Sequence, residues 1–202
     1  MSSQPNEADR SLATVFNLPN QLTSLRLILS IILFAFVAWG YYLTGMVLFI
    51  IAASTDWLDG YYARKYGQVT TLGRILDPFA DKVIICGTFI FLVAIPEMRD
   101  VPWGLRAWMV VVIVGRELLV TALRSFIEER GSDFSAKMAG KLKMVLQCVA
   151  AGAGLFYLSY DPITEGSTWC WVLFVVSLWS SVLLTVYSGV GYIVAAVKLL
   201  RK

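Results

Sequence analysis

Four aspartates have the residue type and the spacing to hold metal ions. They are Asp56, Asp59, Asp77 and Asp81, all within residues 56–81. On a helix, residues three or four apart lie on the same face, so each pair presents two carboxylates together. If the two helices pack antiparallel, the four carboxylates meet at one end of the pair. They would repel one another without a cation, and oxygen ligands without His or Cys suit Mg²⁺ or Mn²⁺.

The surroundings of these aspartates are those of a membrane protein. The chain has 202 residues, of which 58% are hydrophobic and only 15% charged, and its mean hydropathy is +0.70. Soluble domains carry about 25% charged residues. The length predicts a single domain over 1–202, with a polar and disordered start at 1–10. The absence of His and the wide separation of the three cysteines argue against zinc or a disulfide framework.

The apolar runs predict an all-α integral membrane protein with six transmembrane helices. A short interfacial helix is expected over 12–18. Charged or turn-forming residues at 40–45 and 97–106 predict two of the connections. The six predicted spans are residues 21–39, 46–62, 76–95, 107–126, 144–160 and 169–197.

The distribution of basic residues predicts the orientation. Lys and Arg collect in the segments on the side of the two termini, whereas the other side has Arg99 and Arg106. By the positive-inside rule the termini and the aspartates face the cytoplasm. The site therefore meets cytosolic substrates and the inner headgroup layer.

The residues between the aspartates favour chemistry on a diphosphate. Two metal ions about 3.5–4 Å apart can clamp a diphosphate and stabilise displacement at phosphorus. Gly60 and Ala63 share the face of the first aspartate pair, where small side chains let a substrate approach the backbone. Arg64 would place positive charge beside a phosphate. Gly73 precedes Asp77 by four residues and can act like Gly60 on the second helix.

The complete pattern resembles the signature of the CDP-alcohol phosphotransferase family. It reads Asp56-x-x-Asp59-Gly60-x-x-Ala63-Arg64, eight further residues, then Gly73-x-x-x-Asp77-x-x-x-Asp81. The resemblance implies a six-span fold and transfer of a phosphatidyl or phosphoalcohol group from a CDP-alcohol to a hydroxyl, with release of CMP.

The resemblance also implies a role for each signature residue. Asp56, Asp59 and Asp77 would bind two Mg²⁺ or Mn²⁺ ions, and Asp81 would complete the metal site and act as general base. The residues that would line the CDP pocket are Gly60, Ala63, Arg64 and Gly73. A homodimer in a bacterial-type inner membrane is a further expectation, and no nucleic-acid partner is expected.

Three other stretches resemble the bacterial phosphatidylglycerophosphate synthase branch of this family. They are L-P-N-Q-L-T-S-L-R at 18–26, G-R-E-L-L-V-T-A-L-R at 115–124 and G-K-L-K at 140–143. The similarity covers the chain to about Gln147 and departs from the pattern at Met144, where Thr is common. It implies CDP-diacylglycerol as donor, sn-glycerol 3-phosphate as acceptor, and a part in phospholipid biosynthesis.

An acceptor with about two negative charges needs several cations. Arg116, Arg124, Lys141 and Lys143 are the candidates for its phosphate. A charged residue within an apolar span, as Arg116 is, indicates function by default. The alternative is a structural pair of Arg116 with Glu117 or with an aspartate.

Other function classes remain open from the residues alone. A membrane prenyltransferase also uses aspartates and Mg²⁺ on a diphosphate, but its aspartate pairs are expected on distant helices of a longer chain. A non-enzymatic cation transporter would need acidic residues along a path through the membrane. Within the family, inositol phosphate, serine or a second lipid could replace glycerol 3-phosphate.

Overall fold

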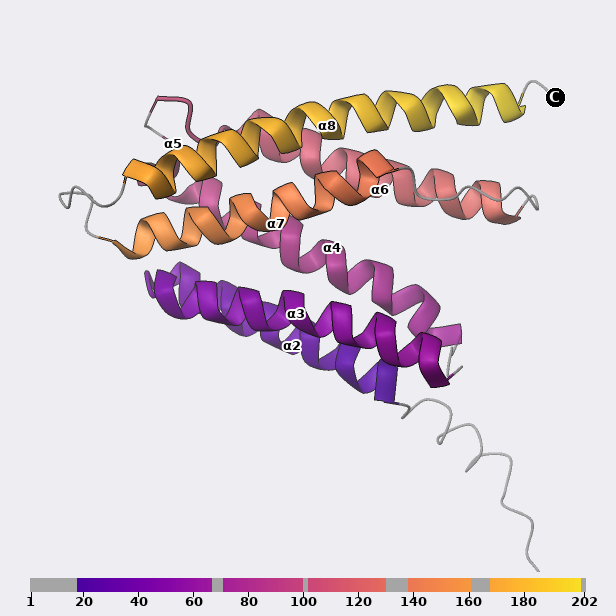
Figure 1. Cartoon of the computed structure of the whole chain (residues 1–202), viewed down its shortest axis with the longest axis horizontal. Coiled ribbons are helices and arrows are strands. Elements are labelled where there is room, and N and C mark those ends of the chain that lie inside the picture. Colours follow the sequence, from indigo (N-terminus) through magenta and orange to yellow (C-terminus); the bar gives the residue numbers. More distant parts are fainter. Residues whose placement is uncertain (1–17, 67–70, 100–101, 130–137, 161–167, 201–202) are drawn as a thin grey trace, which may run out of the picture. The chain divides into compact units, whose positions relative to one another are not determined.

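The computed structural model describes residues 18–66, 71–99, 102–129, 138–160 and 168–200, and these are entirely helical or connecting segments (Figure 1). The prediction of an all-α fold is confirmed for these residues. The predicted interfacial helix at 12–18, apart from its last residue, and the disordered start at 1–10 lie outside them. The helices are α2 Leu18–Ala38, α3 Tyr42–Tyr66, α4 Thr71–Ala94, α5 Pro96–Arg99, α6 Ala107–Glu129, α7 Met138–Ser159 and α8 Thr168–Leu200.

The chain divides into two compact units, Met1–Gly87 and Thr88–Lys202, and the boundary falls within α4. In the first unit, α2 and α3 pack side by side as the indigo and purple pair of Figure 1. α4 begins in this unit, and its Gly87 meets α2: a Cβ at Gly87 would lie 2.1 Å from the ring of Phe34. Glycine at this position therefore lets the two helices approach closely.

A glycine turn joins α2 to α3. Gly40 has φ of 82°, a left-handed conformation that glycine adopts without steric cost. Gly40 N–H donates to the Val37 carbonyl at 3.1 Å and Tyr41 N–H donates to the Phe36 carbonyl at 2.9 Å. The Phe36 and Tyr41 rings meet edge to face, with centroids 6.0 Å apart. These bonds and the ring contact form a Schellman motif, which satisfies the last carbonyls of α2.

Polar side chains are buried on one face of α2, and large apolar side chains are exposed on its outer surface. Thr23, Arg26 and Ser30 are spaced three and four residues apart, which places them on one face, and all three are buried. Ile28 and Ile31 lie on the outer surface, 54% and 67% exposed. A helix in water has the opposite arrangement, so α2 has the surface of a helix that faces lipid.

In the second unit, α8 packs against both α7 and α6. Small residues of α7 permit this approach, as expected for an Ala- and Gly-rich helix. Ala150 and Ala151 are fully buried. A Cβ on Gly154 would lie 3.0 Å from the end of Met98 and 3.1 Å from the Phe174 ring, so glycine leaves room for both side chains.

α8 repeats the pattern of α2 over a longer distance. Its buried polar residues are Ser177, Ser181, Thr185 and Ser188, and its exposed apolar residues include Val176, Leu183, Val186 and Val190. The hydroxyls of Ser177 and Ser181 donate to backbone carbonyls of the preceding turn, which satisfies them without a second helix.

Within the described segments, two helices are long and apolar enough to cross a membrane, Gly140–Ser159 in α7 and Trp169–Val194 in α8. Two shorter apolar stretches, Thr23–Ala38 and Tyr42–Thr55, are found among the described residues. These helices, together with the apolar outer surfaces of α2 and α8, are consistent with a membrane protein.

Two connections differ from the sequence prediction. The predicted connection at 40–45 is shorter, because α3 already begins at Tyr42. The predicted loop at 97–106 contains the short helix α5, Pro96–Arg99. Proline suits the first turn of a helix, and Met98 is fully buried, which anchors α5 in the second unit.

Candidate active site

The four signature aspartates lie on two consecutive helices. Asp56 and Asp59 belong to the C-terminal part of α3, and Asp77 and Asp81 to the N-terminal half of α4. The helical backbone at these positions agrees with the spacing argument made from the sequence. The side chains of Asp56, Asp59 and Asp77 lie outside the described residues, whereas that of Asp81 is described.

Asp81 forms an ion pair with Arg26 of α2, through Nη1 of Arg26 and Oδ1 of Asp81. Arg26 is almost fully buried, with 1% of its side chain exposed, and the Asp81 side chain is 29% exposed. Taking a guanidinium out of water is costly unless a carboxylate compensates it. The pair therefore fixes the position of Asp81 and neutralises its charge.

The donor set of the signature fits a hard divalent cation. Four carboxylates without a thiol or an imidazole match the ligand preference of Mg²⁺ and Mn²⁺. The side chains that the structure describes contain no cluster of three metal-binding groups. The residues expected at the CDP pocket share the same two helices, but their side chains also lie outside the described residues: Gly60, Ala63, Arg64 and Gly73.

A second charged cluster lies in the second unit, between α6, α7 and α8. Glu117 Oε1 accepts from Nζ of Lys143 and lies 3.4 Å from Nη1 of Arg116. Nη2 of Arg116 donates to Ser188 Oγ at 2.8 Å. The guanidinium carbon of Arg116 lies 5.5 Å from the centroid of the Tyr192 ring, a cation–π distance. We call these five residues the α6–α8 charge cluster.

The described charged members of the α6–α8 charge cluster are two cations and one carboxylate. The side chains of Arg116, Glu117 and Lys143 are only 10%, 13% and 5% exposed. Nε of Arg116 is buried and has no hydrogen-bond partner among the described residues. Buried charges require compensation, so two buried cations beside one carboxylate, with an unused donor, suit an anionic ligand.

Gln147 was not among the residues predicted for the site. It follows Lys143 by four residues on α7, so the two share a helix face. Gln147 is 1% exposed, and its Nε2 is buried without a partner in the part of the chain that the structure describes. The spacing from Lys143 was the sequence signal that could have identified it.

The other two predicted acceptor residues lie outside the charge cluster. Lys141 and Arg124 are both exposed. Lys141 precedes Lys143 by two residues, and residues at this spacing do not share a helix face. Arg124 follows Arg116 by eight residues, which is about 12 Å along α6. The structure thus joins Arg116 and Lys143 and separates Arg124 and Lys141 from them.

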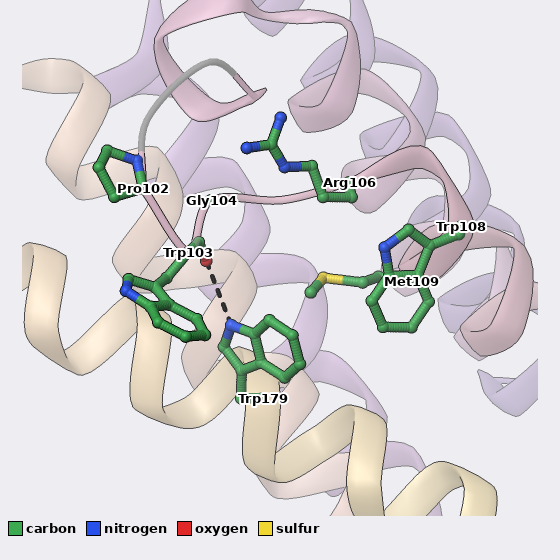
Figure 2. Close-up of a pocket in the computed structure, with 7 residues that line it drawn as sticks. All are labelled: Pro102, Trp103, Gly104, Arg106, Trp108, Met109 and Trp179. Atoms are coloured by element: carbon green, nitrogen blue, oxygen red, sulfur yellow. Dashed lines mark hydrogen bonds between the residues drawn. The ribbon is translucent and has the colours of Figure 1, made fainter.

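A cavity of about 400 Å³ lies at the N-terminal end of α6 (Figure 2). The indole of Trp179 points at the loop before α6, and its Nε1 donates to the carbonyl of Trp103 at 3.2 Å. The residues that line the cavity include neither a carboxylate nor a nucleophile, so the cavity offers no catalytic group. They are Pro102, Trp103, Gly104, Arg106, Trp108, Met109 and Trp179.

Comparison with known proteins identifies the family. The CDP-alcohol phosphatidyltransferase family matches residues 16–187. The chain belongs to this family. The prediction from the aspartate signature, that the protein is an enzyme of this family, is therefore confirmed.

Curated relatives belong to the branch predicted from the sequence. The CDP-diacylglycerol–glycerol-3-phosphate 3-phosphatidyltransferase of Bacillus subtilis is 40% identical over 186 residues, covering 82% of this chain and 93% of that protein. A probable phosphatidylglycerophosphate synthase of Mycobacterium tuberculosis is 36% identical over 205 residues, covering 98% and 90%.

A solved structure has a similar fold. It is the phosphatidylinositol phosphate synthase of Mycobacterium tuberculosis in complex with manganese and citrate, with a TM-score of 0.61 and 19% identity. The similarity covers 94% of this chain and 87% of that chain. At this level of identity the similarity concerns the fold.

Proposed function

We propose that this protein transfers the phosphatidyl group of CDP-diacylglycerol to sn-glycerol 3-phosphate, forming phosphatidylglycerophosphate and CMP in phospholipid biosynthesis. The names of its curated relatives support this donor and acceptor. The observation that carries the choice of a phosphorylated acceptor is that two buried cations, Arg116 and Lys143, contact one carboxylate, that of Glu117. Two buried cations beside one carboxylate favour an acceptor that carries an anionic group.

The signature aspartates form the catalytic centre of this proposal. Asp56, Asp59, Asp77 and Asp81 would hold two Mg²⁺ or Mn²⁺ ions, as the donor set favours. Divalent cations bound there would stabilise the negative charge that develops on the diphosphate during in-line displacement. Space for the CDP moiety is left by Gly60, Ala63 and Gly73, and Arg64 pairs with a phosphate.

Asp81 is the proposed general base. A carboxylate oxygen of Asp81 accepts the proton of the acceptor hydroxyl as the oxygen attacks the phosphorus of CDP-diacylglycerol, and CMP leaves. Arg26 binds Oδ1 of Asp81 and restricts the orientation of the carboxylate. This restriction supports a base that must be aligned with one hydroxyl.

The acceptor phosphate binds to cations of α6 and α7 in this proposal. Arg116 and Lys143 are buried together, and Arg116 has the planar fork that suits a phosphate. Arg124 and Lys141 are exposed and would attract the dianion towards the site.

We further propose six transmembrane spans, α2, α3, α4, α6, α7 and α8, in a bacterial-type inner membrane. The basic residues favour cytoplasmic termini and a cytoplasmic active site. A homodimer is proposed from the family resemblance.

Product identification tests the proposed function. Purified protein in detergent–lipid micelles is incubated with CDP-diacylglycerol, MgCl₂ and isotopically labelled glycerol 3-phosphate, and the lipid extract is analysed by mass spectrometry. The label is expected in phosphatidylglycerophosphate. Labelled lipid that forms only when inositol phosphate is the labelled acceptor would contradict the choice of acceptor and retain the phosphatidyl transfer.

A further inference from the structure

Glu117 has no role in the reaction proposed above, yet its carboxylate lies at the centre of the α6–α8 charge cluster. One oxygen, Oε1, contacts both Nζ of Lys143 and Nη1 of Arg116. The two cations come from different helices, α7 and α6. Glu117 is therefore the group through which the two cations are held next to each other.

α8 holds the same guanidinium from another side. Ser188 Oγ accepts from Nη2 of Arg116 at 2.8 Å, and the ring of Tyr192 lies under the guanidinium. A Cβ on Gly189 would lie 3.2 Å from Cγ of Arg116, so glycine leaves room for the arginine side chain to pass. Glu117 and Ser188 engage the two terminal nitrogens, and Nε has no partner among the described residues.

We propose that Glu117 is a positioning residue of the acceptor site. Its carboxylate holds Arg116 and Lys143 as one preformed binding unit for a phosphomonoester dianion. The two cations of this unit can form charge-assisted hydrogen bonds with a phosphate. This inference rests on the proposed function only in requiring an acceptor that carries a phosphate.

The sign of the effect of Glu117 on phosphate binding distinguishes positioning from a simple charge effect. If Glu117 did no more than reduce the positive charge, its removal would strengthen the binding of an anion. If it holds the two cations in place, its removal lets them move apart by mutual repulsion and weakens the binding. The Michaelis constants of the two substrates therefore report which role applies.

The test compares Glu117→Gln and Glu117→Asp with the wild type and with the matched control Glu97→Gln. Glu97 is exposed on α5 and takes no part in the charge cluster. We expect Glu117→Gln to raise the KM for glycerol 3-phosphate about tenfold, the loss of one charge-assisted hydrogen bond, and to change the KM for CDP-diacylglycerol less than about twofold. Glu117→Asp is expected to lie between Glu117→Gln and the wild type.

Two results would overturn the inference. One is a KM for glycerol 3-phosphate that is unchanged or lower in folded Glu117→Gln. The other is a parallel rise of both KM values, which would indicate a general structural role. Size-exclusion elution and thermal unfolding establish that the variant is folded.

Ser188→Ala provides a second test, in case Glu117→Gln fails to fold. It removes the hydrogen bond between Arg116 and α8 without changing the charge, and we expect a rise of about threefold in the KM for glycerol 3-phosphate alone. An unchanged KM would contradict the preformed unit.

The failure of this inference can be distinguished from the failure of the proposed function. A wild-type protein that shows no turnover with glycerol 3-phosphate contradicts the proposed function. The dissociation constant of inorganic phosphate, measured by isothermal titration calorimetry, then tests Glu117 without turnover. Phosphate is expected to bind more weakly to Glu117→Gln than to the wild type and to Glu97→Gln, and equal or tighter binding would overturn the inference.

Discussion

At the scale of single residues, the central question is what Asp81 does. Asp81→Asn retains the shape of the side chain and removes its ability to accept a proton. We expect turnover to fall by a factor of about 10² to 10⁴, the usual contribution of a general base. CDP-diacylglycerol is still expected to bind, because the signature residues on α3 are unchanged. The measurements are the rate of CMP release and equilibrium binding of the lipid substrate.

Full activity of Asp81→Asn would remove Asp81 from the mechanism. Loss of lipid binding together with turnover would instead assign Asp81 to the metal site alone.

Arg26 gives an independent readout, because Arg26→Ala leaves the carboxylate in place without its partner. The thermal stability of Arg26→Ala is expected to fall, since removing one member of a buried ion pair leaves the other uncompensated.

Replacing Arg116 is expected to affect the binding of one substrate more than that of the other. Arg116→Ala is expected to raise the KM for glycerol 3-phosphate by a factor of about 10 to 100, corresponding to one or two lost charge-assisted hydrogen bonds. The KM for CDP-diacylglycerol should change much less. Arg106→Ala is the matched control, because Arg106 is exposed and immediately precedes the same helix. Equal effects on both substrates, or loss of folding alone, would make Arg116 a structural residue.

The residues of the site differ in how far the sequence could predict them. The aspartate signature is local, with fixed spacing on two helices, so its positions could be read directly. Arg116 was visible as a charge within an apolar run, and its contact with Glu117 was one of the two alternatives. The pairing of Arg26 with Asp81, 55 residues apart, and of Arg116 with Ser188, 72 apart, depends on tertiary packing. No local pattern contains that information.

At the scale of the helices, the turn between α2 and α3 is a point of predictable sensitivity. Gly40→Ala is expected to lower stability by about 1 kcal/mol, because alanine resists the left-handed conformation with φ of 82°. The measurement is the thermal unfolding temperature in a fixed detergent. Gly152→Ala is the matched control: Gly152 lies within α7 with open space around its Cβ position, so alanine should be neutral or stabilising. Equal unfolding temperatures for the two variants would contradict this account of the turn.

The helices themselves were predicted from apolar runs, and the six long helices that the structure describes agree with the prediction to within six residues at each end, the largest difference being the earlier start of α7 at Met138. The sequence did not predict α5, because four residues are too few for a periodic pattern. The burial of Met98 fixes this segment, and that burial depends on distant residues such as Gly154 of α7. The predicted turn at 40–45 was longer than the observed one. The backbone hydrogen bonds of Gly40 and Tyr41 close the end of α2, and α3 begins at the next residue, Tyr42.

At the scale of the whole molecule, the proposed topology can be tested with single cysteines. The three native cysteines, Cys86, Cys148 and Cys170, are free and buried or half-buried, which agrees with the sequence argument against a disulfide framework. After their replacement by serine or alanine, Ser3→Cys and Ser167→Cys report the two sides of the membrane. In intact cells, a membrane-impermeant maleimide is expected to label position 167 and not position 3. Labelling at position 3 would contradict cytoplasmic termini.

The measurement that tests the central claim most directly is the initial rate of CMP release from CDP-diacylglycerol with MgCl₂ and one acceptor at a time. The acceptors are glycerol 3-phosphate, inositol 1-phosphate, serine and phosphatidylglycerol. We predict rapid CMP release with glycerol 3-phosphate, little with the others, and none in the presence of EDTA. Rapid release with serine or inositol 1-phosphate, and none with glycerol 3-phosphate, would contradict the claim.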